Sequence, residues 1–201
     1  MSEDGLSHMR ALLLDDSPHM LSILRTILQG FGVTDVAEAR DAATAFEMVR
    51  DHRPDFAVID LQLDDLSGLE FTQLIRTAPD SPDRMLPIIM VTAHSERRRI
   101  IDAINAGVNE FLVKPVSPKA LFSRIRAVIE RPRPFIKAPG YFGPDRRRQN
   151  LKHNEERRQD MQEQAPVPAE QAMEQDQINA IFNPGSKHPD DQTDNPVGPE
   201  T

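Results

Sequence analysis

The sequence has no cysteine and no tryptophan, and it has no apolar run long enough to cross a membrane. Without cysteine it has no disulfide, no thiolate metal ligand and no thiol nucleophile. The first ten residues, MSEDGLSHMR, are acidic and lack the apolar stretch of a signal peptide. We therefore expect a cytoplasmic protein that does not insert into a membrane.

Aromatic residues are also scarce, at 5% of 201 residues, and a hydrophobic content of 38% is enough for one modest core. The formal charge is -6 for residues 1–130, +6 for 131–152 and -8 for 153–201, and ten of the 17 prolines lie after residue 130. We therefore expect one folded domain over 9–130. We expect a basic, Pro/Gly-rich linker over 131–152, extended rather than packed, and an acidic, mostly disordered tail over 153–201.

Up to about residue 130, short apolar runs alternate with amphipathic stretches of helical period. This alternation predicts βα units and a mainly parallel sheet. Strands are expected at about 10–14, 33–37, 55–60, 86–91 and 109–113. Helices are expected after Ser17-Pro18, from about 42, over 67–77, over 95–106, and after Ser117-Pro118 with Ser117 as N-cap.

Polar residues follow four of these apolar runs at the point where each strand ends. They are Asp15 with Asp16, Asp60, Thr92 and Lys114. In a parallel sheet with helices on both faces, ligands bind outside the carboxyl ends of the strands, so these side chains are expected to meet at one site. Taken singly each has an ordinary interpretation, such as capping of the first helix by the two aspartates, and only their convergence indicates function.

The chemistry of this group favours a divalent cation and phosphoryl transfer. Three carboxylates held together are costly without a cation, and oxygen ligands with no histidine or thiolate nearby favour Mg²⁺. Asp60 is the candidate nucleophile, because a carboxylate can become an aspartyl phosphate. Lys114 would then neutralise one phosphoryl oxygen while Thr92 donates a hydrogen bond to another.

The segments LLLDDS, FAVIDLQLDDLSGLE, MVTAH and FLVKPVSP together resemble the receiver domain of bacterial two-component response regulators, over residues 9–130. Their order is that of the family, and the separations of 44 residues from Asp16 to Asp60 and of 22 from Thr92 to Lys114 are similar to the family's. The resemblance implies a flavodoxin-like α/β fold, with a doubly wound five-stranded parallel sheet of order 2-1-3-4-5.

The resemblance also implies a response regulator in phosphorelay signal transduction. Asp60 would accept phosphate from a histidine kinase or phosphotransfer protein, and the protein would act as a phosphoacceptor rather than an enzyme, with slow self-dephosphorylation at most. Mg²⁺ would be held by Asp16, Asp60 and the Gln62 main-chain carbonyl, with Asp15 acting through water. Output is expected through protein-protein contacts, with no membrane partner.

Thr92 and Phe111 correspond to the switch residues of the family that this sequence resembles. There the hydroxyl moves toward the phosphoryl group and the aromatic ring swings inward, which changes the surface of the fourth helix, fifth strand and fifth helix. The Lys114-Pro115 bond is expected to be cis. The family often has tyrosine where this chain has Phe111, and Gln62 and His94 occupy positions that in the family tune phosphoryl lifetime.

The sequence leaves two alternative functions open. A transcription or nucleic-acid-binding regulator would use the basic linker, but the tail has no helix-turn-helix pattern and no second apolar core, so nucleic acid is disfavoured as a partner. A phosphatase with an aspartyl nucleophile would generally have a second aspartate two positions after the nucleophile, where this chain has Gln62.

Three features lie outside these motifs. The run YFGPDRRR at 141–148 suits docking to a protein or nucleic acid, with a plain basic linker as the alternative. The three arginines at 97–99 open the fourth helix against its dipole, and they suit either a partner surface or a solvated face. A weak amphipathic helix is predicted by the spacing of four apolar residues, Met173, Ile178, Ile181 and Phe182.

Overall fold

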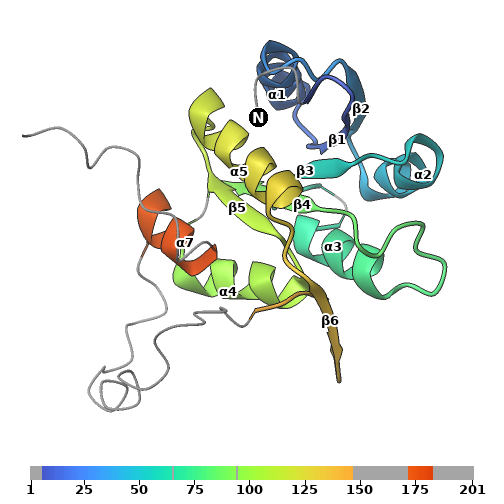
Figure 1. Ribbon diagram of the computed structural model, residues 1–201, viewed down its shortest axis with the longest axis vertical. Helices are drawn as coiled ribbons and strands as arrows, with labels where there is room; N and C mark the ends of the chain where they lie inside the picture. The colour runs from blue at the N-terminus through green and yellow to red at the C-terminus, as the bar shows by residue number, and fades with distance from the viewer. Residues whose placement is uncertain (1–5, 65, 94, 147–171, 183–201) are drawn as a thin grey trace, which may run out of the picture.

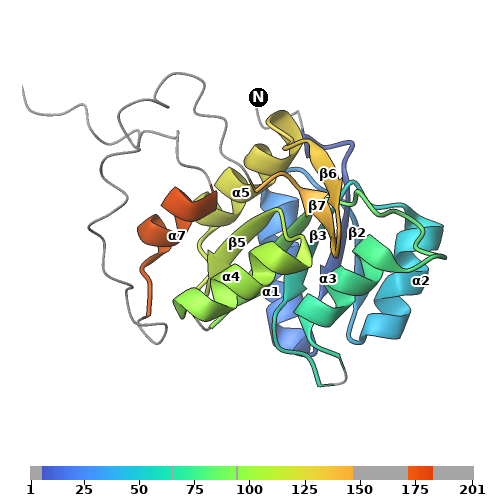
Figure 2. The ribbon, with the colours of Figure 1, turned by 90° about the horizontal axis from the view of Figure 1, so that it is seen from below.

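The computed structural model describes residues 6–64, 66–93, 95–146 and 172–182, and its main body is a parallel sheet covered by helices on both faces (Figures 1 and 2). The strands are β1 (Arg10–Leu14), β2 (Asp35–Ala39), β3 (Phe56–Asp60), β4 (Ile88–Thr92) and β5 (Glu110–Val113). The helices between and after them are α1 (Pro18–Gly30), α2 (Ala42–His52), α3 (Gly68–Thr77), α4 (Arg97–Ala106) and α5 (Pro118–Glu130). The strand order is β2-β1-β3-β4-β5 with every pair parallel, which confirms the expected fold class.

The strands separate two apolar cores, because successive side chains of a strand point to opposite faces. In β1, Leu12 and Leu14 lie in the core that α2, α3 and α4 cover, while Ala11 and Leu13 lie in the core under α1 and α5. β3 and β4 are buried along their whole length, as expected for central strands of a doubly wound sheet. No helix among the described residues has the length and apolar content to cross a membrane.

Side-chain caps fix where the helices next to the strand ends begin. The Ser17 hydroxyl accepts a hydrogen bond from the Met20 backbone N–H, and Pro18 occupies the first turn of α1. Ser117 caps α5 in the same way through Ala120, which confirms the expected N-cap. α1 and α5 therefore start at the carboxyl-end edge of the sheet, immediately after the polar residues that follow β1 and β5.

β2 begins later than the sequence pattern indicates, at Asp35 rather than near residue 33. Val33 is apolar and fully buried, but its N–H donates to the Leu28 carbonyl and it belongs to the turn that ends α1. Gly32 makes this turn with a φ of +86°. The predicted start of this strand near residue 33 was therefore wrong, because the apolar Val33 is buried as part of a turn.

Part of the region 131–152 differs from the expected extended linker. β6 (Phe135–Ala138) and β7 (Tyr141–Pro144) pair as an antiparallel hairpin. Its turn is Pro139-Gly140, with Gly140 at a φ of +72°, and proline followed by a left-handed glycine is a common tight-turn combination. The proline and glycine that suggest an unpaired linker therefore form the turn of a short hairpin.

The hairpin packs against α3 and α4 rather than standing free. The rings of Phe135 and Phe142 lie 5.6 Å apart, and the buried Arg76 guanidinium lies 5.0 Å from the centre of the Phe135 ring. A Cβ on Gly143 would lie 2.9 Å from the Gly107 Cα, so these two backbone segments approach closely only because both residues lack a side chain.

The domain limits predicted from the sequence, 9–130, 131–152 and 153–201, stay a prediction.

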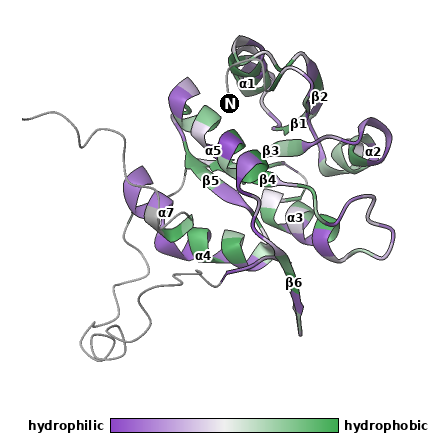
Figure 3. Ribbon diagram, viewed as in Figure 1, coloured by the Kyte–Doolittle hydropathy of each residue, from purple (hydrophilic) through white to green (hydrophobic). Residues whose placement is uncertain are grey.

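The expected C-terminal amphipathic helix is confirmed as α7 (Gln175–Phe182), which lies beside β5 (Figure 1), although Met173 lies before its first residue. Figure 3 shows the change along α7 from hydrophilic residues to hydrophobic ones toward its end. Ile178 and Phe182 are buried in the core that contains α4. The rest of the expected tail, 153–171 and 183–201, lies outside the described residues.

Candidate functional site

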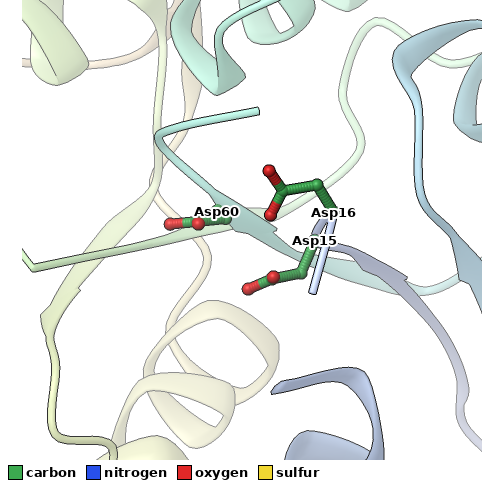
Figure 4. Close-up of side chains that lie close together, drawn as sticks. All are labelled: Asp15, Asp16 and Asp60. Carbon is green, nitrogen blue, oxygen red and sulfur yellow. The ribbon is translucent and has the colours of Figure 1, made fainter. Parts of the chain in front are cut away.

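The carboxyl ends of β1 and β3 bring three aspartates together (Figure 4). Asp15 and Asp16 follow directly on β1, and Asp60 is the last residue of the neighbouring β3. Carboxylate oxygens of the three residues lie within 4.8 Å of one another. The clustering that the strand-end pattern indicates is therefore present in the structure.

Lys114 completes the cluster from the end of β5. Its Nζ lies 3.0 Å from Asp60 Oδ2 and 3.3 Å from Asp15 Oδ2, so one ammonium bridges two carboxylates. Its backbone N–H donates to the Thr92 carbonyl at 2.7 Å, which fixes the chain at the base of the side chain. One positive charge faces three carboxylates, and the site therefore keeps an excess of negative charge.

Burial raises the pKa of Asp60 above its ordinary value. The hydrogen bond and charge of Lys114 lower this pKa, the neighbouring Asp15 carboxylate raises it, and a hydrogen bond with the Gln62 backbone lowers it. The net direction is upward because desolvation is the largest of these effects. The ionised carboxylate is thus less stable here than in water, and an added positive charge would favour it.

Asp15 is held by the backbone of the same loop. Its Oδ1 accepts a hydrogen bond of 2.9 Å from the Ser17 N–H, and the residue is almost completely buried. The side-chain cap of α1 is Ser17 and not an aspartate, so helix capping alone does not account for both carboxylates. The Asp16 carbonyl accepts hydrogen bonds from Arg40, while its carboxylate is only half-buried.

Gly68, at the start of α3, permits a close approach to the acceptor strand. A Cβ built at this position would lie 2.2 Å from the Asp60 carbonyl oxygen, which is backbone and cannot move aside. The Gly68 N–H also donates to the Leu61 carbonyl at 2.9 Å. The loop between β3 and α3 therefore closes over the Asp60 backbone only with glycine at position 68.

The two expected switch residues lie on neighbouring strands. Thr92 ends β4, is buried, and is in register with Val113 of β5. Phe111 is fully buried on β5, and its ring stacks on that of Phe182 with centres 6.0 Å apart. The Lys114-Pro115 peptide bond is cis, as the resemblance implied.

Some sequence-based expectations fall outside this geometry. His94 and Asp65, and Arg147 and Arg148 of the basic run, lie outside the described residues. Arginines 97–99 are exposed at the start of α4, which leaves both of their interpretations open. Gln175, whose amide donates to the Phe111 carbonyl, was not among the residues predicted to matter. Its only signal was its place at the start of the weak amphipathic helix.

The donor set fits a magnesium ion. Among the residues that the structure describes, Asp15, Asp16 and Asp60 form the one group of three acidic, histidine or cysteine side chains close enough to share a metal. All the donors are carboxylate oxygens, the type that Mg²⁺ prefers. The protein supplies only a few of them, which suits Mg²⁺ because this ion usually keeps several bound waters. The raised pKa of Asp60 and the excess negative charge both fit a site that a divalent cation would stabilise.

Comparison with known proteins gives one family. A family model described as the response regulator receiver domain matches residues 11–126. The chain is 36% identical over 123 residues to the chemotaxis protein CheY of Pseudomonas aeruginosa, covering 61% of this chain and 98% of that protein. It is 32% identical over 122 residues to the DNA-binding response regulator MtrA of Mycolicibacterium smegmatis, covering 61% of this chain but only 51% of that protein.

Solved structures agree with this result. Chemotaxis protein CheY4 of Vibrio cholerae matches with a TM-score of 0.56 and 25% identity, over 60% of this chain and 98% of that one. The structure of a protein described as a putative response regulator, from Chloroflexus aurantiacus, matches with a TM-score of 0.56 and 28% identity. The match covers 61% of this chain and 98% of that one. The family match ends at residue 126, before the β6–β7 hairpin and α7.

Proposed function

The chain belongs to the response regulator receiver domain family, and from this premise we propose that Asp60 is its phosphoacceptor, phosphorylated by a histidine kinase or phosphotransfer protein. The observation that carries the proposal is the ammonium of Lys114 bridging Asp60 and Asp15 at the carboxyl ends of the strands. Receiver domains are generally phosphoacceptors on aspartate. The choice of Asp60 follows from its place at the end of the central strand β3.

The transfer that we propose moves one phosphoryl group between two protein side chains. A carboxylate oxygen of Asp60 attacks the phosphorus of a phosphohistidine, and a P–O bond forms as the P–N bond breaks. The electron pair of that bond returns to the imidazole nitrogen, which takes a proton from solvent. The product is an acyl phosphate on Asp60.

Each neighbouring side chain has a defined part in this proposal. Lys114 pairs with a phosphoryl oxygen in place of one of its present carboxylate contacts, and the Thr92 hydroxyl donates to another phosphoryl oxygen. Asp16, Asp60 and the Gln62 carbonyl would hold Mg²⁺, with Asp15 acting through water. When bound, the cation would supply positive charge against the carboxylates and the transferred group.

The output that we propose is a change in protein-protein contacts. Phosphorylation favours one of two pre-existing arrangements of Thr92 and Phe111, and a partner distinguishes between them by differential affinity. Slow hydrolysis of the Asp60 acyl phosphate returns the protein to its starting state, without turnover of an external substrate.

The test of the acceptor is phosphate incorporation from a small phosphodonor with Mg²⁺. We expect close to stoichiometric, acid-stable and base-labile label in the unaltered protein and none in Asp60→Asn. The matched control is Asp64→Asn, because Asp64 is exposed in the same loop and should label normally. Full labelling of Asp60→Asn would contradict the assignment, and loss of label in both variants would show that the loss in Asp60→Asn is not specific to that carboxylate.

A further inference from the structure

The segment of residues 172–182, here called the docking segment, lies against β5, the edge strand of the sheet. An edge strand presents backbone N–H and C=O groups that no neighbouring strand pairs. The Gln175 amide contacts two of them. Its Oε1 accepts from the Val113 N–H at 2.7 Å, and its Nε2 donates to the Phe111 carbonyl at 3.3 Å. One side-chain amide therefore imitates the backbone of an added strand.

Two apolar side chains of α7 anchor the docking segment. Ile178 is 0% exposed and Phe182 is 3% exposed. The Phe182 ring stacks on Phe111 with 17° between the ring planes, and the Arg133 guanidinium lies 5.9 Å from the centre of the Phe182 ring. These residues lie three and seven positions after Gln175, so all three share one face of the helix. That face packs against β5 and the residues around it.

Polar contacts extend the attachment to α4 and α5. The Met173 N–H donates to the Ser95 carbonyl at 2.9 Å, next to the start of α4. On α5, the buried Arg124 is ion-paired with Glu110 at 3.2 Å and also donates to the Asn179 side chain. The docking segment thus touches the edge strand and both neighbouring helices.

The docking segment depends on this surface for its structure. α7 has 8 residues, and isolated helices of this length are marginal in water. Its folding is therefore coupled to docking, and an undocked segment would lose the helix. Such a segment is more easily released than a preformed one, because the entropy cost of ordering it offsets part of the free energy of its contacts.

We propose that residues 172–182 occupy in cis the surface formed by β5 with the facing sides of α4 and α5, the surface that the family's switch changes, and that they compete there with a partner helix. The partner has the same chemistry: an amide side chain for the β5 edge, followed by an aliphatic residue three positions later and an aromatic residue seven positions later. Release is coupled to the phosphoryl site through β5, because Val113, which Gln175 contacts, directly precedes Lys114. Only this trigger rests on the proposed function.

The first test uses the full chain and a fluorescent peptide of residues 172–182. Anisotropy should show that a chain carrying Gln175→Ala and Phe182→Ala binds the peptide about tenfold more tightly than the unaltered chain, whose site is occupied. The matched control is Glu174→Ala, because Glu174 is exposed on the same segment and should leave binding unchanged. A peptide with the Phe182→Ala change should not bind either chain. Failure of the peptide to bind the double variant would overturn the docking site.

Hydrogen exchange of the Val113 amide gives a second readout that does not depend on peptide affinity. Gln175→Ala should speed exchange about tenfold relative to the unaltered chain and to Glu174→Ala, because one hydrogen bond is lost. Unchanged exchange would contradict the contact. Sedimentation should show a monomer, and a concentration-dependent dimer would mean that a second copy supplies the segment, which overturns occupancy in cis.

The trigger has its own test. The full chain is loaded with beryllofluoride and Mg²⁺, a phosphoryl mimic, and peptide binding and Val113 exchange should both increase. Loading at Asp60 without either change would overturn the coupling while leaving the docking site intact. Failure to load at all would overturn the phosphoacceptor assignment, and the peptide competition between unloaded variants would still decide the docking site.

Discussion

The ammonium nitrogen of Lys114 lies 3.0 Å from Asp60 Oδ2, although 54 residues separate the two in the sequence. The contact places a positive charge at the end of the central strand, where burial disfavours the ionised carboxylate. It also joins the end of β5 to the end of β3 across the intervening β4. One side chain therefore connects Asp60 directly with the edge strand of the sheet.

Lys114→Met should abolish most phosphorylation of Asp60. The change removes the hydrogen bond and the charge that lower the pKa of Asp60, so this pKa should rise further. The labelling rate should fall by about tenfold or more, because a charge that stabilises the transferring group is lost. Lys119→Met is the control, since Lys119 is exposed on α5 and should label at the normal rate. Equal rates in the two variants would contradict the role given to Lys114.

Asp60→Asn should stabilise the fold at neutral pH, because it removes a carboxylate whose ionised form is disfavoured by burial. A carboxyl whose pKa is raised on folding binds its proton more tightly in the folded state, so its ionisation favours unfolding. This cost is fully present above the folded pKa and disappears below the ordinary value of 3.8. Denaturant unfolding at several pH values should show the difference between variant and unaltered protein closing as the pH falls.

Mg²⁺ should also stabilise the fold, because its charge offsets the cost of keeping Asp60 ionised. Titration with the ion should raise the melting temperature of the unaltered protein, because binding to the folded state alone stabilises it. The Asp60→Asn variant should respond much less, since it has lost a carboxylate ligand. An equal response in both proteins would place the ion outside the cluster of Asp15, Asp16 and Asp60.

The parallel fold could be predicted because its signals are local. Apolar runs of strand length, helical stripes and capping serines such as Ser17 and Ser117 each show in a few consecutive residues. The site could be predicted from the same source, because polar residues such as Asp60 and Lys114 directly end those runs. Once the sheet is parallel, its topology brings these ends together, so no knowledge of long-range packing was needed.

The additions to the parallel fold could not be predicted in the same way. The β6–β7 hairpin has four residues in each strand, too few to establish an alternating pattern, and Pro139-Gly140 suits a linker as well as a turn. The helix α7 was visible in the spacing of Ile178 and Phe182. Its position against β5 was not visible, because Gln175 meets Val113 across 62 residues of sequence.

Gly68→Ala should destabilise the protein by about 1–3 kcal/mol, the usual cost of forcing an extra methyl group into a packed site. Alanine is the better helix former, by about 1 kcal/mol, but the Cβ would lie 2.2 Å from the Asp60 carbonyl oxygen, and the clash outweighs the propensity. The loop should move to relieve it, so the phosphorylation rate should fall as well.

Gly30→Ala is the matched control for this substitution. Gly30 ends α1, and nothing lies within 4 Å of the position that its Cβ would take. Helix propensity then acts alone, and the variant should be unchanged or more stable by up to about 1 kcal/mol. Denaturant midpoints of the two variants give the comparison. Equal effects of both substitutions would show that the Asp60 backbone can yield.

Arg76→Met should destabilise the fold by several kcal/mol, because it leaves buried oxygens without their hydrogen-bond donor, at a cost of about 1–3 kcal/mol each. The guanidinium is almost completely buried, which lowers its pKa to about 10. It donates to the carbonyls of Gly107, Arg84 and Leu86 and to the side-chain oxygen of Asn109. Methionine fills much of the volume but leaves all four oxygens without this donor.

Arg76→Lys distinguishes the geometry of the guanidinium from its charge. An ammonium keeps the charge but cannot donate in the planar fork that reaches these acceptors together, so it should recover only a small part of the lost stability. Arg97→Met, at an exposed position of α4, should change the unfolding free energy by less than about 0.5 kcal/mol. Because Arg76 also lies over Phe135, loss of its guanidinium should speed hydrogen exchange in β6 and β7. Full recovery by lysine would mean that charge, and not the fork of donors, holds α3, β4, β5 and the hairpin together.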